Sequence, residues 1–159
     1  MHNGSMGNVD TSLYDADFYL WTQRASERLR SGNLAADDLE HAAEEIADMG
    51  KRDRRELQSR MIVLVMHLMK WAAQPKLRKT STWLDTISEQ RIQIDGVLEQ
   101  SPSLRSYLIG ELPAIFGKAA LRAAIQTKLP VETFRTTEQN ANLDRLLSAG
   151  FLPDDMSCL

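Results

Sequence analysis

The sequence has few of the residues that mark specialised protein classes. It contains one cysteine, Cys158, so it cannot form an internal disulfide, and this lone thiol is a poor candidate for a nucleophile. Glycine (8) and proline (5) are scarce among the 159 residues, and no segment has the low-complexity composition of a linker. The opening residues lack the apolar stretch of a signal peptide. We therefore expect a cytoplasmic globular protein.

Long alternating patterns are also missing. No segment alternates apolar and polar residues for long enough to predict a β-strand, and the longest apolar run falls short of the roughly 20 residues that cross a membrane. The sequence predicts an all-α fold, a compact bundle of about six helices with a long, kinked central helix pair. A single helical domain is expected over residues 13–153, between a flexible N-terminal segment, 1–12, and a flexible C-terminal tail, 154–159.

The central helical pattern covers residues 37–74. Leu57, Met61, Leu64 and Leu68 recur at steps of four and three, which places them on one face of a helix. Ile62, Met66 and Met69 fall on a second flank. A helix that is apolar on two sides is either buried inside the fold or shared with a partner subunit.

Breaking and capping residues predict where the helices begin and end. Asp15 is an expected N-cap for a first helix that Gly32 ends. Gly50 is expected to break or kink the central pattern, and Pro75 to close it. Pro113 should end or kink a later helix. A short helix near residues 142–149 is expected last.

The segment that follows Asp37 has two different faces. Its predicted core side consists of Leu39, Ala42, Ala43 and Ile46. Its opposite, polar side consists of Glu40, His41, Glu44, Glu45 and Asp48. Carboxylates and an imidazole on adjacent turns can contribute to a helical metal site, but no second helix carries a matching Glu-x-x-His motif. The main interpretation is a solvated acidic face, with no metal and no cofactor.

Charge is distributed unevenly along the chain. Residues 1–50 hold three arginines against ten acidic residues, and residues 51–80 hold nine basic against two acidic residues. This pattern favours contact between the acidic first third and the basic middle, within one chain or across a dimer. A nucleic-acid site on the basic middle is the alternative, which the acidic pI of about 5.6 disfavours.

Several uncommon dipeptides, in a characteristic order, carry a resemblance to a known family. They are Tyr14-Asp15-x-Asp17-Phe18 with Trp21, Ala43-Glu44-Glu45-Ile46 with Gly50, Arg54-Arg55-Glu56-Leu57-x-Ser59, His67-Leu68-x-Lys70-Trp71 with Pro75, Trp83 with Gln90-Arg91, Pro102-Ser103-Leu104 and Phe151-Leu152-Pro153. The chain resembles the bacterial family called domain of unknown function 29 over residues 13–153. The resemblance implies a small helical bacterial protein with no assigned activity or catalytic residue. Ser81-Thr82-Trp83 and Pro113 depart from the usual pattern.

Four polar residues are candidates for a site. Arg91 lies between Ile87 and Ile94 on a face that should be buried, so its guanidinium needs a negative partner. The sequence predicts an ion pair with Glu44 or Glu45, which the family pattern repeats; a bound anion or ligand is the alternative. His67 is expected to be a hydrogen-bonded structural residue rather than a ligand or base.

Aromatic residues complete the candidates. Trp21, Trp71 and Trp83 are interpreted as packing anchors, with a shared aromatic pocket as the alternative. No nucleophile stands in a recognisable catalytic motif and no glycine-rich phosphate loop occurs, so no catalytic residue is predicted. The leading hypothesis is a non-enzymatic protein-interaction domain, as a homo-oligomer or with a protein partner. The alternatives are a small metal- or anion-binding protein or hydrolase that uses Glu44, Glu45, His67 and Arg91, and nucleic-acid binding.

Overall fold

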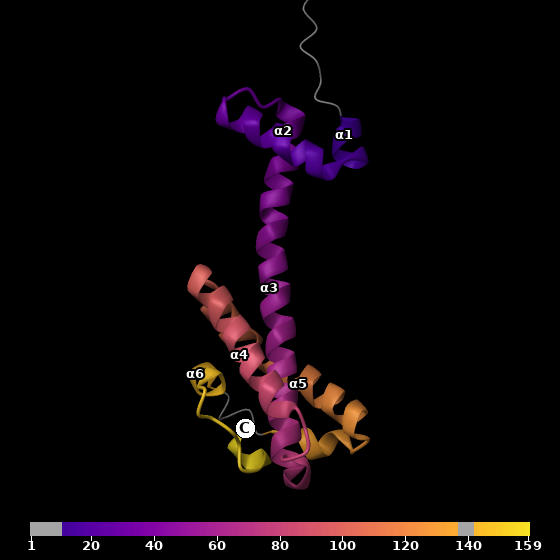
Figure 1. Ribbon diagram of the computed structural model, residues 1–159, viewed down its shortest axis with the longest axis vertical. Coiled ribbons are helices and arrows are strands. Elements are labelled where there is room, and N and C mark those ends of the chain that lie inside the picture. The colour runs from indigo at the N-terminus through magenta and orange to yellow at the C-terminus, as the bar shows by residue number, and fades with distance from the viewer. Residues whose placement is uncertain (1–10, 137–141) are drawn as a thin grey trace, which may run out of the picture. The chain divides into compact units, whose positions relative to one another are not determined.

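The computed structural model describes residues 11–136 and 142–159, and within these ranges its regular structure is helical without any strand. The prediction of an all-α fold with about six helices is confirmed. Apart from residues 11 and 12, the predicted flexible segment 1–12 lies outside the described residues. The elements in Figure 1 are α1 (Thr11–Ala16), α2 (Phe18–Arg30), α3 (Ala36–Ala73), η1 (Pro75–Leu77), α4 (Trp83–Gln100), α5 (Leu104–Thr127), η2 (Val131–Phe134), α6 (Leu143–Leu147) and η4 (Met156–Cys158).

By its contacts the chain divides into two compact units, which meet in sequence at Arg52 and Asp53. The first unit contains α1, α2 and the N-terminal half of α3. The second unit contains the rest of α3 and all later elements. The prediction of one domain over residues 13–153 stays a prediction.

In the first unit, α2 begins later than the sequence predicted. Asp17, and not Asp15, is the N-cap, and its carboxylate accepts a hydrogen bond from the Leu20 amide at 2.9 Å. Asp15 is instead part of α1. Gly32 follows the end of α2 with a φ of +71°, a left-handed conformation that glycine adopts without strain.

The first half of α3 turns a different face inward from the one predicted. Leu39 and Ile46, assigned to the core, are 54% and 66% exposed, whereas His41 and Glu45, assigned to the outer side, are half-buried. The reason is chemical. Tyr14 and Trp21 carry O–H and N–H donors into this packing, and buried donors need the acceptors that the acidic face supplies.

The predicted break at Gly50 is wrong, because α3 continues through it from Ala36 to Ala73 as one helix rather than as a pair of helices. A helical glycine costs only about 0.5–1 kcal/mol relative to alanine, which neighbouring contacts can offset. Here the Lys51 ammonium lies 2.8 Å from the Asp48 carboxylate, on either side of Gly50.

The second unit holds the main hydrophobic core. Leu57, Leu64 and Leu68 are fully buried, and Ile62 and Met66, on the second flank of α3, are at most 4% exposed. The prediction that this helix is covered on more than one side is therefore confirmed. The other core residues come from every later helical element except η1 and η4, together with Leu159.

The sequence predicted that Pro113 would end or kink its helix, whereas α5 continues through the proline. The proline lies inside the helix on its exposed side, while Leu112, Ile115 and Phe116 beside it are buried. On that side, solvent can hydrogen-bond the carbonyl that proline leaves without a donor. Burial of the apolar inner side stabilises the helix across Pro113.

The end of the chain packs against the core. The Asn142 side chain caps α6 by accepting from the amides of Asp144 and Arg145, as the sequence predicted. The sequence assigned residues 154–159 to a flexible tail, whereas the structure places them partly in η4 and leaves Leu159 only 2% exposed.

Candidate functional site

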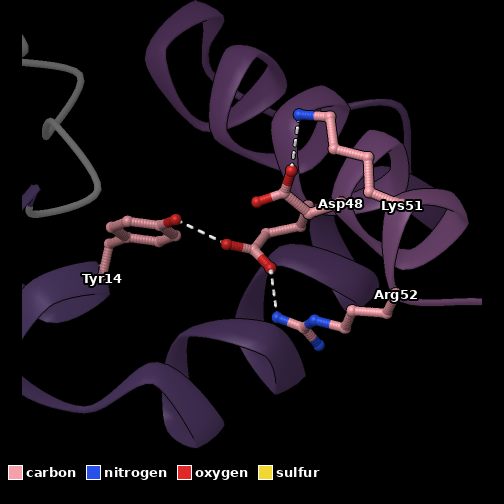
Figure 2. A network of polar contacts seen from close by, with 5 residues as sticks. Tyr14, Asp48, Lys51 and Arg52 are labelled. Carbon is pink, nitrogen blue, oxygen red and sulfur yellow. Dashed lines mark hydrogen bonds and ion pairs between the residues drawn. The ribbon is translucent and has the colours of Figure 1, made fainter. Parts of the chain in front are cut away.

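A polar network in the first unit joins α1 to α3 (Figure 2). The Tyr14 hydroxyl donates a hydrogen bond of 2.6 Å to one carboxylate oxygen of Glu45. The other oxygen of Glu45 lies 3.9 Å from the Arg52 guanidinium. Glu45 thus accepts a hydrogen bond from Tyr14 of α1 and pairs with the cation of Arg52 on α3 at the same time.

The network changes the acidity of Tyr14. The hydrogen bond to Glu45 is the main cause that raises the pKa of Tyr14 to about 12, and burial adds to it. The negative charges of Glu45, Glu44 and Asp15 act in the same direction because they disfavour a second anion. Tyr14 is therefore a stable hydrogen-bond donor at neutral pH and a poor acid.

A second polar contact lies beside the first. The indole N–H of Trp21 donates to one carboxylate oxygen of Asp38 at 3.1 Å, and both side chains are 2% exposed. The rings of Tyr14 and His41 stack at 4.3 Å between centroids, and Trp21 meets Tyr14 edge-on at 4.8 Å. Aromatic packing and charge-assisted hydrogen bonds thus hold α1, α2 and α3 together in this unit.

Two buried atoms of this cluster lack a hydrogen-bond partner within the described residues: the other carboxylate oxygen of Asp38 and Nδ1 of His41. They belong to residues one helical turn apart on α3, and the Asp38 oxygen is an acceptor. Tyr14 and Asp38 were not among the site residues predicted from the sequence. Asp38, His41 and Glu45 do follow the three-and-four spacing of one helix face, which would have placed them together.

The four candidate polar residues each have their own surroundings. Glu44 is exposed and lies 4.0 Å from His41, and Glu45 binds Tyr14 and Arg52. The Nδ1 of His67 lies 2.8 Å from the Val63 carbonyl oxygen one turn earlier in α3. Because a carbonyl only accepts, Nδ1 carries the proton. Burial lowers the pKa of His67.

Arg91 is buried on α4, as the sequence predicted, but its partners are not those expected. Its guanidinium donates to the carbonyl oxygens of Leu146 at 2.9 Å, Ala149 at 3.5 Å and Phe151 at 2.7 Å. Carbonyl oxygens, rather than the carboxylates of Glu44 or Glu45, thus satisfy it. Burial lowers the pKa of Arg91, and the charge of Asp95 opposes that shift.

The other two tryptophans lie in the second unit next to cations. Trp83 is buried, with the Lys70 ammonium 5.1 Å from its ring centroid. Trp71 is half-buried under the Arg78 guanidinium at 5.2 Å, and its carbonyl accepts from Arg78 at 2.8 Å. These contacts are cation–π packing.

The second unit also has an open groove of about 360 Å³ between α3 and α4. Its charged lining residues, Glu56 and Arg60, pair with each other at 2.8 Å. The rest of the lining is Ser59, Val63 and Gln90, so neither His67 nor Arg91 faces this groove.

The described residues hold neither a metal-binding cluster nor a membrane-spanning helix. In residues 11–136 and 142–159, no group of three or more His, Cys, Asp or Glu side chains could hold a metal ion. Within the same ranges, none of the helices combines the length and apolar content that a membrane crossing requires.

The first unit leaves a row of α3 residues exposed: Leu39, Ala43, Ile46 and Gly50, here called the α3 stripe. Steps of four, three and four put them on one face of the helix, away from the face that binds Tyr14 and Trp21. Met49 beside the stripe is 61% exposed. Apolar side chains at helical spacing with this exposure are typical of a binding surface.

Comparison with known proteins gives one match. The model of the family described as domain of unknown function DUF29 matches residues 13–152, nearly the whole chain. No curated protein and no solved structure matches the sequence. The match covers Tyr14, Trp21, Asp38, His41 and Glu45, as well as His67 and Arg91. The chain is therefore a member of the DUF29 family.

Proposed function

We propose that this protein is a non-enzymatic protein-interaction domain whose first unit carries the binding surface. The observation that carries the proposal is the exposed α3 stripe. Its two large residues, Leu39 and Ile46, are more than half exposed, although the sequence pattern is that of a core face. Burial of such side chains against a partner gives about 1.5–3 kcal/mol each, which favours association.

The polar candidates support a structural role more than a chemical one. The guanidinium of Arg91 is occupied by three carbonyl oxygens, and His67 donates within its own helix. Tyr14, with a pKa of about 12, stays protonated at neutral pH. A general acid or base works best with a pKa near the working pH, which Tyr14 does not have.

The basic middle of the chain offers little free charge for nucleic acid. Most of its cations are engaged by partners in the same chain: Lys51 with Asp48, Arg52 with Glu45, Arg54 with the Tyr107 ring, Arg60 with Glu56, Lys70 with Gln126 and the Trp83 ring, and Arg78 with Trp71 and Asp154. Together with the acidic pI, this favours protein contact over phosphate contact.

The test is photo-crosslinking in the cells that make the protein. A photoreactive phenylalanine analogue at Ile46 should yield a crosslinked species of defined mass, identified by mass spectrometry. The matched control is the same analogue at Ile125 of α5, which is 77% exposed in the second unit and should give none. Absence of a crosslink from Ile46, or equal crosslinking from both sites, would overturn the proposal.

A further inference from the structure

We infer that the α3 stripe binds a second copy of the same chain, with the two α3 helices antiparallel. The inference rests on the proposed function and names its partner. Two observations carry it: the order of large and small residues along the stripe, and the placement of opposite charges at the two ends of one flank.

The order of sizes makes the stripe complementary to itself. Along α3, a large residue alternates with a small one: Leu39, Ala43, Ile46, Gly50. When a copy of the helix is reversed, Leu39 lies over Gly50 of the second copy and Ile46 over Ala43 of the second copy. Large side chains then fill the spaces that small ones leave, as packed helices require. Nothing lies within 4 Å of the position that a Gly50 Cβ would take, so that space is open.

A parallel pair would lose this fit. It would place Leu39 over Leu39 of the second copy and Gly50 over Gly50 of the second copy, which crowds one end and leaves a gap at the other. It would also align the acidic residues that precede Gly50 with their own copies.

Charge favours the same direction. Glu40 and Lys51 lie on the same flank of the stripe, near its two ends, because their separation of eleven residues is close to three helical turns. In an antiparallel pair related by a twofold axis, equal flanks face each other, and the register that places Leu39 over Gly50 brings Glu40 within two residues, or about 3 Å along the helix axis, of Lys51 of the second copy. A lysine side chain is long enough to span that offset. Lys51 now pairs with Asp48 across exposed surface, which holds it only weakly.

The stripe is also free of the contacts that build the first unit. Tyr14 and Trp21 pack on the face of Asp38, His41 and Glu45, about a third of a turn away. A second helix can therefore cover Leu39 and Ile46 without displacing α1 or α2. Met49, at the edge of the stripe, adds apolar area to the same contact.

The first experiment is sedimentation equilibrium of the full chain over a range of concentrations. We expect a dimer with twice the 18.0 kDa mass of one chain. Ile46→Glu should weaken dimerisation by about 100-fold, the scale of a central interface residue. Ile125→Glu is the matched control and should leave the dimer unchanged. Circular dichroism checks that both variants keep their helical content. A monomer at all concentrations, or a dimer insensitive to Ile46→Glu, would overturn the inference.

Charge exchange tests the antiparallel direction. Glu40→Lys and Lys51→Glu should each weaken self-association about threefold to tenfold, because each creates two like-charge contacts. Mixing these two variants should give a heterodimer at least as tight as the native dimer, since every pair across the interface is then of opposite charge. A mixture that associates no better than either variant alone would rule out the antiparallel pair.

The experiments distinguish a failure of the proposed function from a failure of the pairing of two copies. If the chain is monomeric while the analogue at Ile46 crosslinks to a different protein, the self-pairing is wrong and the proposed function stands. If Ile46 crosslinks to nothing, the proposed function is wrong as well.

Discussion

At the scale of single residues, the first unit depends on polar atoms placed against aromatic rings. Glu45 accepts from Tyr14, and Asp38 accepts from Trp21, so two acidic side chains hold two aromatic ones. Buried donors with strong acceptors stabilise a fold, whereas a donor left without one costs about 1–3 kcal/mol. The titration behaviour of these residues is therefore a direct test of the geometry.

Tyr14 should ionise only at strongly alkaline pH. With its pKa raised to about 12, its phenol stays protonated while the ordinary value of 10.0 is passed. The protonated form is favoured in the folded state, so its stabilising contribution is present below about pH 10 and is lost as the pH rises toward 12. An ultraviolet titration of tyrosinate should show a late step that Tyr14→Phe removes. The control is Tyr19→Phe, at a site 74% exposed, which should not remove this late step. A late step that survives Tyr14→Phe would contradict the geometry.

His67 should make stability depend on pH in the acidic range. Burial lowers the pKa of His67 below the ordinary value of 6.5, so His67 binds a proton less readily in the folded chain than in the unfolded chain. Its contribution to stability is therefore complete above the ordinary value of 6.5 and is lost as the pH falls through the lowered pKa. We expect the free energy of urea unfolding to fall more for the native chain than for His67→Gln over that interval. An equal fall in both chains would show that His67 is not the group responsible.

At the scale of elements, α3, α5 and the segment after α6 show that tertiary contacts can outweigh local sequence preferences. Helix α3 continues through Gly50 because a glycine costs a helix only about 0.5–1 kcal/mol, and α5 continues through Pro113 because its inner side is buried. The segment from α6 onward has little regular structure of its own. It is held by Arg91 and by Arg78, whose guanidinium donates to the Asp154 carbonyl at 2.6 Å.

Gly50→Ala should stabilise the protein if α3 is continuous. Alanine gains about 0.5–1 kcal/mol in a helix interior, and the added methyl meets nothing within 4 Å. The matched control is Gly32→Ala, which should destabilise because Gly32 has a φ of +71°. Urea unfolding of both variants, each combined with Ile46→Glu so that the proposed contact between two copies does not contribute, provides the measurement. A loss of stability in Gly50→Ala would indicate that the helix is broken there.

Arg91→Lys should loosen the segment that follows α6. A lysine ammonium is compact and cannot reach the three carbonyl oxygens that the planar guanidinium reaches. We expect a loss of about 1–3 kcal/mol in the free energy of unfolding, since buried acceptors lose their donors. Arg105→Lys, where the arginine is exposed and pairs with Asp144, should change stability by about 0.5 kcal/mol or less. Equal losses in the two variants would argue against the carbonyl contacts.

At the scale of the whole molecule, the two units differ in how much apolar surface they bury. Helix α2 buries only Trp21 and Ala25, whereas α5 buries seven residues. A helix with few buried side chains opens at lower free energy than one in the centre of a core. The exposed α3 stripe adds to this difference because its leucine and isoleucine stay more than half exposed in the first unit.

Hydrogen exchange should reveal this difference in the intact chain. Amides of α2 are expected to exchange faster than those of α5 by an order of magnitude or more, because α2 opens locally while α5 opens only with the core. Peptides from the two helices in one sample serve as each other's control. Raising the protein concentration should slow exchange in residues 39–50 if the stripe binds a second copy. Uniform protection across α2 and α5 would contradict the unequal burial.

The sequence by itself determined the helical class, the buried stripe of the second unit and the burial of Arg91, because three-and-four spacing fixes which residues share a helix face. Only the tertiary structure decided what each face meets. Arg91 meets carbonyls at the end of α6 and just after it, at positions more than fifty residues away, and no local pattern encodes that approach. The first half of α3 turns Asp38 and Glu45 inward because Trp21 and Tyr14, on other helices, bring donors that leucine and isoleucine could not satisfy.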